Sequence, residues 1–205
     1  WCDSFVPEDM SMRRLGFAVA AVVAGGVAAQ AAEAWKTITL RGEAGFTVSI
    51  PAVAENKVDA AKPDDLLFIA VDAMLHGSLT CIGHRADYPK DVTRAAFGAA
   101  LATARREVFC GNDKAAAGTL SIAGSESFQR DGRQGAVCTA SYTESKAELP
   151  GRVESNMVIA AASGAYSLTC MTEDEDQELA EYEWASFWGE KVKHIQDSFR
   201  LPEGR

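Results

Sequence analysis

Histidine, cysteine and methionine side chains lie close together in the middle of this 205-residue chain. Met74 and His76 precede Cys81 and His84, and thioether, imidazole and thiolate groups are the ligands that copper prefers. Successive side chains of a β-strand alternate between its faces, so Cys81 and His84 should point to opposite sides. The spacing therefore favours surface or loop histidines, His194 included, and we predict no metal site.

A run of four acidic residues at 173–176 offers the clustered carboxylates that Ca²⁺ binds. The run lacks the spaced ligands and the glycine of a calcium loop. Acidic side chains are also favourable at the N-terminus of a helix, where the helix dipole is positive. We therefore interpret the run as the start of the last helix.

Nucleophilic catalysis has no recognisable signature in the chain. No G-x-S-x-G motif is present, and Ser125 lies in a predicted strand rather than at a strand-to-helix turn. The glycines form neither a phosphate-binding loop nor a dinucleotide fingerprint. Trp184, Phe187 and Trp188 could face a ligand, but their helical spacing favours a role in the core. We predict no catalytic residue and no cofactor-binding residue.

The charge and the N-terminal segment restrict where such a protein works. The formal net charge is −9, whereas a phosphate backbone needs a basic surface, so nucleic acid is excluded as a partner. Residues 10–31 are identified as a signal peptide: Arg13 and Arg14 precede an apolar run of about 13 residues, and Ala29 and Ala31 provide a small-x-small cleavage site.

The apolar run of the signal peptide is shorter than the roughly 20 residues of a membrane span. We therefore expect a periplasmic or secreted protein with no stable membrane span after cleavage, exported by the Sec or the twin-arginine route. Residues 1–9 precede the candidate start codons at Met10 and Met12 and are interpreted as an over-extended N-terminus. Residues 32–205 have the length of a single domain.

Cysteines in the exported part predict disulfides, because an even number after a signal peptide is typical of an oxidising compartment. The candidates are Cys81, Cys110, Cys138 and Cys170. A strand over 78–86 followed by a returning helix would bring Cys110 back beside Cys81, which favours that local bridge. Cys138 and Cys170 would then remain, yet in a plain meander their strands are separated by a third, too far for a bridge. The pairing stays open.

Apolar periodicity predicts an α+β chain. Alternating or apolar runs indicate strands over 35–40, 46–50, 66–73, 78–86, 120–129, 134–143, 153–162 and 165–171. Apolar residues at helical spacing indicate helices over 92–109 and 178–199, the first with Asp91 as its N-cap. Asp131-Gly132 is the strongest hairpin signal, and consecutive hairpins make an antiparallel meander.

Two short motifs and this order of elements resemble the PsbP/Mog1-like family. "GFTVSIP" is similar to the first core strand of that family, and "IQDSFRLP" to its C-terminal helix. The resemblance covers residues 35–203 and implies an antiparallel sheet sandwiched by helices. The four cysteines and the alanine-rich middle helix depart from the family pattern, and no functional motif is matched.

The resemblance implies a non-enzymatic binding module, since assembly and transport factors share this fold. From it and the signal peptide we predict an exported, soluble, non-catalytic binding or assembly module for an unknown protein or small-molecule partner. Two alternatives stay open: a small secreted hydrolase with an unrecognised site, and a periplasmic metal-handling protein.

Overall fold

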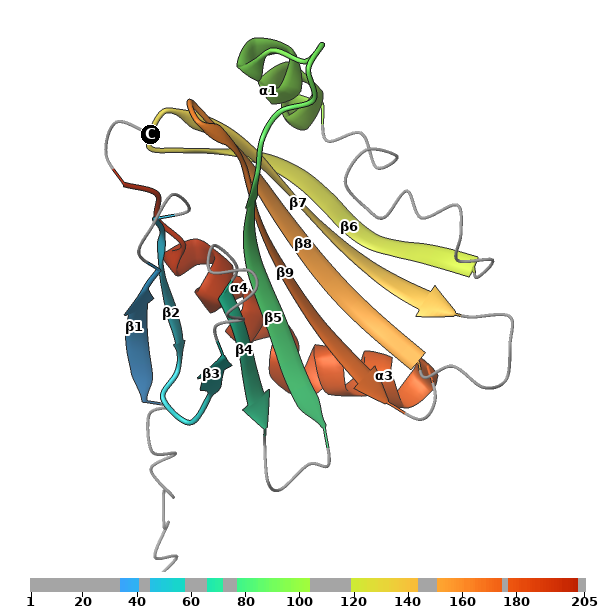
Figure 1. Ribbon diagram of the computed structural model, residues 1–205. Helices are drawn as coiled ribbons and strands as arrows, with labels where there is room; N and C mark the ends of the chain where they lie inside the picture. Colours follow the sequence, from blue (N-terminus) through green and yellow to red (C-terminus); the bar gives the residue numbers. More distant parts are fainter. Residues whose placement is uncertain are drawn as a thin grey trace, which may run out of the picture. The chain divides into compact units, whose positions relative to one another are not determined.

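The computed structural model describes residues 34–40, 45–57, 66–71, 77–103, 119–143, 151–174 and 177–202. The chain divides into two units, residues 1–32 and 33–205, and all described residues belong to the second. Its elements, labelled in Figure 1, are β1 (Trp35–Thr39), β2 (Thr47–Pro51), β3 (Glu55–Lys57), β4 (Leu66–Val71), β5 (Ser78–Ala86), α1 (Arg94–Ala102), β6 (Thr119–Arg130), β7 (Arg133–Thr143), β8 (Gly151–Ala161), β9 (Gly164–Asp174), α3 (Gln177–Glu183), a π-helical turn η1 (Trp184–Trp188) and α4 (Gly189–Ser198).

An antiparallel sheet of seven strands forms the centre of this unit, in the order β3-β4-β5-β9-β8-β7-β6. Strands β6 to β9 form the predicted meander. Strand β5 does not pair with β6, its successor among the strands, but lies antiparallel to β9. Strands β1 and β2 form a separate two-stranded sheet.

The predicted hairpin at Asp131-Gly132 joins β6 to β7. Both residues have positive φ, 52° and 69°. This is the backbone of a type I′ turn, whose twist matches that of the two strands it connects. The turn places Arg130 directly opposite Arg133 at the end of the hairpin.

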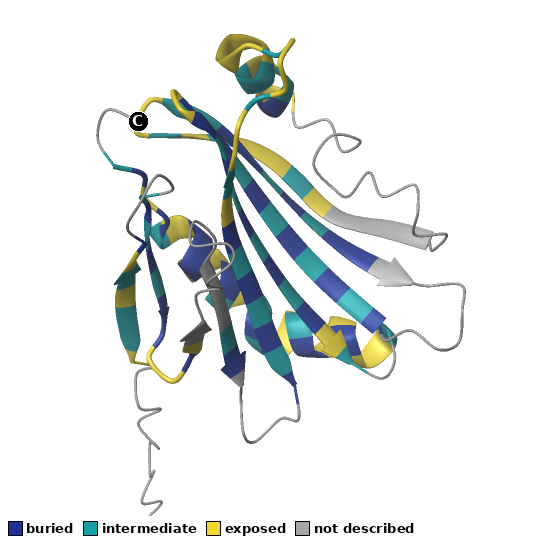
Figure 2. Ribbon diagram, viewed as in Figure 1, coloured by how far each residue is buried: buried dark blue, intermediate teal, exposed yellow. Residues whose placement is uncertain are grey.

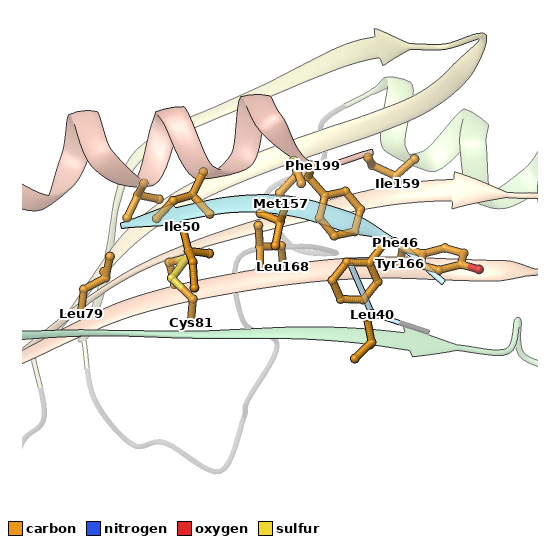
Figure 3. Packing of buried hydrophobic residues seen from close by; sticks show 14 of the residues in the cluster. Leu40, Phe46, Ile50, Leu79, Cys81, Met157, Ile159, Tyr166, Leu168 and Phe199 are labelled. Atoms are coloured by element: carbon orange, nitrogen blue, oxygen red, sulfur yellow. A yellow bond between two sulfur atoms is a disulfide. The ribbon is translucent and has the colours of Figure 1, made fainter. Parts of the chain in front are cut away.

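One face of the sheet carries the main core (Figures 2 and 3). Odd-numbered residues of β8 and even-numbered residues of β9 are buried on this face, together with Val48 and Ile50 of β2 and Phe46 just before it. Trp188, Val192, Ile195 and Phe199 of the C-terminal helical segment cover them. The predicted apolar faces of strand 46–50 and of this helix are confirmed.

Helix α1 packs on the opposite face, where Phe97 and Leu101 contact Ala136, Cys138 and Ala160. Its N-cap is not Asp91, as predicted, but Thr93, whose side-chain oxygen accepts a hydrogen bond from the Ala96 amide at 3.2 Å. Thr93 has the extended backbone of a cap, so the helix begins two residues later than its apolar pattern indicates. The predicted residues 104–109 lie outside the described part of the chain.

Helices therefore pack on both faces of an antiparallel sheet, which confirms the predicted α+β class. The long C-terminal helix predicted over 178–199 is interrupted by η1, after which α4 continues to Ser198. The prediction that the acidic run begins this helix is wrong for Glu173 and Asp174, which are the last residues of β9. Glu175 and Asp176 lie outside the described residues.

A disulfide joins Cys81 of β5 to Cys170 of β9, which confirms disulfide bonding but not the favoured local pairing. The prediction of Cys81–Cys110 is wrong because β5 pairs with β9, which places the two cysteines directly opposite each other with Cα atoms 4.0 Å apart. The remaining pairing, Cys138–Cys170, is excluded as well.

Strand β8 separates Cys138 from Cys170, and the two side chains lie on opposite faces of the sheet. Cys138 is also disulfide-bonded, and Cys110 lies outside the described residues.

Candidate functional site

A groove of about 300 Å³ runs between the β6–β8 part of the sheet and the C-terminal helical segment. We call it the α4 groove. The sheet contributes Glu126, Phe128, Arg130, Val137, Thr139 and Met157, and the helical segment contributes Trp184, Gly189, Val192, Lys193, Gln196 and Asp197. Its volume is at the lower end of the range for small-ligand sites.

Aromatic side chains form part of the wall of the groove. The π-helical turn gives Trp184 a position different from that of Trp188: Trp188 is buried in the core, whereas Trp184 is only partly buried and lines the groove. Gly189 leaves room for this arrangement, because a Cβ there would lie 3.1 Å from the Trp184 carbonyl oxygen and 3.5 Å from its indole nitrogen. Single π turns inside helices are frequent at functional sites.

Phe128 covers Gly135, the residue opposite it on β7, where any Cβ would collide with the phenyl ring. Arg130 in turn lies over the same ring, with its guanidinium carbon 4.9 Å from the ring centroid. Phe128 is therefore held between its neighbouring strand and a cation, and it presents a fixed apolar surface to the groove.

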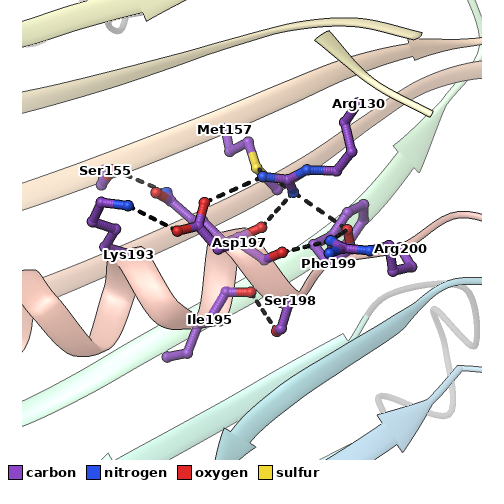
Figure 4. A network of polar contacts seen from close by, with 10 residues as sticks. Arg130, Ser155, Met157, Lys193, Ile195, Asp197, Ser198, Phe199 and Arg200 are labelled. Atoms are coloured by element: carbon purple, nitrogen blue, oxygen red, sulfur yellow. Dashed lines mark hydrogen bonds and ion pairs between the residues drawn. The ribbon is translucent and has the colours of Figure 1, made fainter. Parts of the chain in front are cut away.

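Arg130 closes the end of the groove at the C-terminus of α4 (Figure 4). Its Nη1 donates to the carbonyl oxygens of Gln196 at 2.6 Å and Phe199 at 3.3 Å, and its Nη2 lies 3.3 Å from an Asp197 carboxylate oxygen. The last carbonyls of a helix have no partner within the helix and carry its negative dipole end. Partial burial lowers the pKa of Arg130, and the nearby Arg200 lowers it further.

A series of buried hydrogen bonds supports the floor of the α4 groove. The Gln196 amide donates to the Ser155 hydroxyl at 3.0 Å, and the Thr139 hydroxyl donates to the same oxygen at 3.2 Å. Buried polar groups must be hydrogen-bonded to be tolerated, and here the bonds join α4 to both β7 and β8. These hydrogen bonds fix the distance between α4 and the sheet, and with it the width of the groove.

Charged residues of both signs form the rim. Lys193 donates to Asp197 at 2.8 Å, one turn along α4, and this hydrogen bond raises the pKa of Lys193. Lys193 therefore stays protonated at neutral pH. Glu126 is exposed on β6, across the groove from α4, and its negative charge raises the pKa of Lys193 slightly as well. These are fixed charges, suited to orienting a ligand rather than to transferring protons.

The histidines and Ser125, considered above as possible site residues, do not line the groove. His84 is exposed on the face of β5 opposite Cys81, as alternation predicts, and His194 stacks on Trp35 with ring centroids 4.0 Å apart. Ser125 lies on β6, facing away from the groove-lining Glu126. Met74 and His76 lie outside the described residues, among which no cluster of three metal-ligating side chains occurs.

A second polar cluster joins α3 to the sheet. The buried Ser141 hydroxyl donates to the Glu181 carboxylate, and the Gln177 amide donates to that carboxylate at 3.0 Å. These hydrogen bonds lower the pKa of Glu181. Gln177 also accepts from the Arg152 amide at 3.0 Å, so the cluster anchors the start of α3 and has a structural role.

The groove cannot be predicted from the sequence, because its residues come from strands and helices far apart in the chain. One signal was available: Glu126, Phe128 and Arg130 alternate on the inward face of a strand, where charged residues are unusual. Of the three aromatic residues Trp184, Phe187 and Trp188, Trp188 is buried in the core, and Trp184 and Phe187 are partly buried and pack against it. Trp184 also lines the groove.

The layers, the meander and the C-terminal helix define a PsbP/Mog1-like fold, as the resemblance implies. The Ran-binding protein Mog1p of Saccharomyces cerevisiae superimposes with a TM-score of 0.53 at 11% identity, over 82% of this chain and 96% of that one. The cyanobacterial PsbP (CyanoP) of Synechocystis gives 0.49 at 14% identity, over 87% and 96%.

At sequence identities of 11% and 14%, these matches show that the fold is shared, and they show nothing about function. No family model matches the chain, and no curated protein sequence matches it. In the described residues no helix is long and apolar enough to cross a membrane.

Proposed function

We propose that the chain is an exported, non-catalytic binding module that holds a partner molecule in the α4 groove. The observation that carries this proposal is the partly exposed Trp184 at a π-helical turn, beside a fixed apolar wall and a charged rim. An aromatic side chain next to an apolar floor and a few oriented charges is the composition of a binding site.

The state of the rim residues supports binding rather than catalysis. Arg130 and Gln196 are held by hydrogen bonds that stabilise the fold, and Lys193 is kept protonated by Asp197. A general base must be able to accept a proton near neutral pH, and a lysine with a raised pKa cannot. Mog1p, which shares the fold, is described as Ran-binding, and this precedent for protein binding is one of fold only.

Export is supported by two independent features. The signal peptide over residues 10–31 directs the chain out of the cytosol, and the buried Cys81–Cys170 disulfide is of the kind that persists in an oxidising compartment. We therefore place the mature protein, residues 32–205, in the periplasm or outside the cell.

Site-specific photo-crosslinking in the host tests the proposal. A benzophenone amino acid at Lys193, on the rim, should give a discrete crosslinked product that Trp184→Ala greatly reduces. The matched control carries the same amino acid at Lys90, an exposed residue before α1, and should not give that product. The absence of any product from position 193, or the same product from both positions, would contradict the proposal.

A further inference from the structure

The charged side chains that line the α4 groove are paired with one another, apart from Glu126. One oxygen of the Asp197 carboxylate accepts a hydrogen bond from Lys193 at 2.8 Å, and the other lies 3.3 Å from Arg130 (Figure 4). Glu126 is exposed on β6 and makes no hydrogen bond or ion pair with the part of the chain that the structure describes. It acts on Lys193 only through its charge. The groove therefore carries a carboxylate that is available to a ligand.

An apolar strip leads away from this carboxylate across the floor of the groove. Val137 lies directly opposite Glu126 on β7, and Met157 lies directly opposite Val137 on β8. Directly opposite residues of antiparallel strands have side chains close enough to interact. Met157 is buried, whereas Val137 is only partly buried and lines the groove. A ligand that reaches Glu126 thus meets an apolar surface next to it.

Trp184 supplies an aromatic surface on the helical side of the groove. Its ring is only partly buried, and its indole N–H makes no hydrogen bond within the described residues. Among aromatic side chains, the face of an indole ring attracts a cation most strongly. A carboxylate, an apolar strip and an accessible indole together suit a cation at the end of an apolar stem. Lysine and arginine side chains have this composition, because they bury their stems while the charged end stays at a polar edge.

An acidic ligand fits the groove less well. Both cations at the rim are occupied, Lys193 by Asp197, and Arg130 by Asp197 and the carbonyl oxygens that end α4. An anion would have to displace these partners, and Glu126 would repel it. The formal net charge of the chain, −9, acts in the same direction, because a negatively charged surface attracts basic partners and repels acidic ones.

We infer that the α4 groove binds a basic side chain of a partner protein, with its apolar stem along Val137 and Trp184 and its cation on the Glu126 carboxylate. This inference rests on the proposed function, since it assigns the chemistry of the partner that the groove holds. The volume of about 300 Å³ suits a single side chain. One exposed ion pair and one apolar stem make a weak contact by themselves, so other parts of the partner supply the remaining affinity.

Nuclear magnetic resonance of the Trp184 indole N–H, assigned with the Trp184→Phe variant, tests this chemistry on the protein isolated from its host. N-acetyl-lysine amide and N-acetyl-arginine amide, titrated to millimolar concentrations, should shift this signal in a saturable way. N-acetyl-norleucine amide has a similar stem without the charge and should bind several-fold more weakly. N-acetyl-glutamate amide should leave the signal unchanged.

Two matched variants place the cation. Glu126→Gln should weaken the binding of both basic compounds about threefold or more, as the loss of an exposed ion pair predicts. Glu55→Gln removes the same charge from an exposed position on β3 and should leave their binding unchanged. The absence of a shift with both basic compounds, equal affinity for the lysine and norleucine compounds, or an affinity that Glu126→Gln does not alter would overturn the inference.

The photo-crosslink from position 193 keeps this inference separate from the proposed function. It reports whether a partner occupies the groove, whatever the chemistry of that partner. A discrete product that depends on Trp184, together with no binding of the basic compounds, would reject the basic side chain and leave the groove as a binding site. Loss of the product would count against the proposed function itself.

Discussion

Arg130 shows how one side chain can join three parts of this protein. It lies on β6, stacks on Phe128, and donates hydrogen bonds to the carbonyls that end α4. Its side chain is only 17% exposed, so these charge-assisted bonds are protected from water. The C-terminal residues of the domain are therefore held in place by the β6–β7 hairpin.

Replacing Arg130 by leucine should lower the free energy of unfolding by about 1–3 kcal/mol, because the carbonyls of Gln196 and Phe199 each lose a charge-assisted hydrogen bond and keep only the one from the Phe199 amide or from Arg200. Urea denaturation followed by circular dichroism measures the loss. Lys90→Leu removes a cation from an exposed position and should leave the midpoint unchanged. An Arg130→Leu midpoint equal to that of the original protein would show that the network does not stabilise the fold.

Ser141 and Glu181 predict a pH-dependent contribution to stability. Hydrogen bonds from Ser141 and Gln177 lower the pKa of Glu181 below its ordinary 4.5 in the folded state. A carboxylate with a depressed pKa stabilises the fold above the unfolded-state value, and the contribution is lost as pH falls through the folded-state value.

Ser141→Ala should therefore destabilise the protein more at pH 7 than at a pH below the lowered folded-state pKa of Glu181, in urea titrations at both values. Ser186→Ala, an exposed serine in η1, provides the control and should show no such dependence. A Ser141→Ala deficit that is the same at both pH values would contradict the assignment.

At the scale of elements, the π-helical turn separates two tryptophans that regular helical spacing would place on one stripe. Trp188 fills the core between the helix and the sheet, and Trp184 lines the groove. A single extra residue in the turn thus leaves Trp188 fully buried and Trp184 only partly buried at the edge of the same core.

Trp188→Ala should cost about 3–5 kcal/mol of stability, the usual range for truncating a buried tryptophan. Trp184→Ala should cost clearly less, because its ring is only partly buried. Guanidinium unfolding of the two variants, compared with the original protein, tests this order. A Trp188→Ala loss below about 1 kcal/mol would mean that the helix presents another face to the sheet.

Local patterns predicted most elements of this fold, because each depends on residues close in sequence. Alternation predicts β2 and β5 to β9 to within a few residues, and Asp131-Gly132 predicts its hairpin. The helix start at Thr93 and the π turn at Trp184 were missed, since a cap and an extra helical residue depend on single contacts that periodicity does not contain.

The pairing of β5 with β9 could not be predicted either, because nothing local specifies which distant strand completes a sheet. That one pairing decides the disulfide and places the meander next to β3–β5. The α4 groove was missed for the same reason, since it lies where β6–β8 face a helix that follows them in the chain.

At the scale of the whole domain, the Cys81–Cys170 disulfide connects two residues that are 89 positions apart in the sequence. It joins the β3–β5 half of the sheet to the β6–β9 meander, within the main core. A cross-link that closes a long loop stabilises mainly by restricting the unfolded chain.

The double variant Cys81→Ala, Cys170→Ala should therefore lose about 4.6 kcal/mol of stability, as loop-closure entropy predicts for a loop of this length. Chemical denaturation under non-reducing conditions measures the loss. A double variant as stable as the original protein would show that this cross-link contributes nothing.

A disulfide joins β5 to β9, and we propose that the domain that carries it is exported. Non-reducing peptide mapping of the protein isolated from its host tests both parts in one measurement. The account predicts an N-terminal peptide that begins at Ala32, since Ala29 and Ala31 occupy the cleavage positions, and a peptide pair linked through Cys81 and Cys170. Free thiols at these two cysteines, a Cys81–Cys110 link, or a chain that retains Arg13 and Arg14 would contradict it.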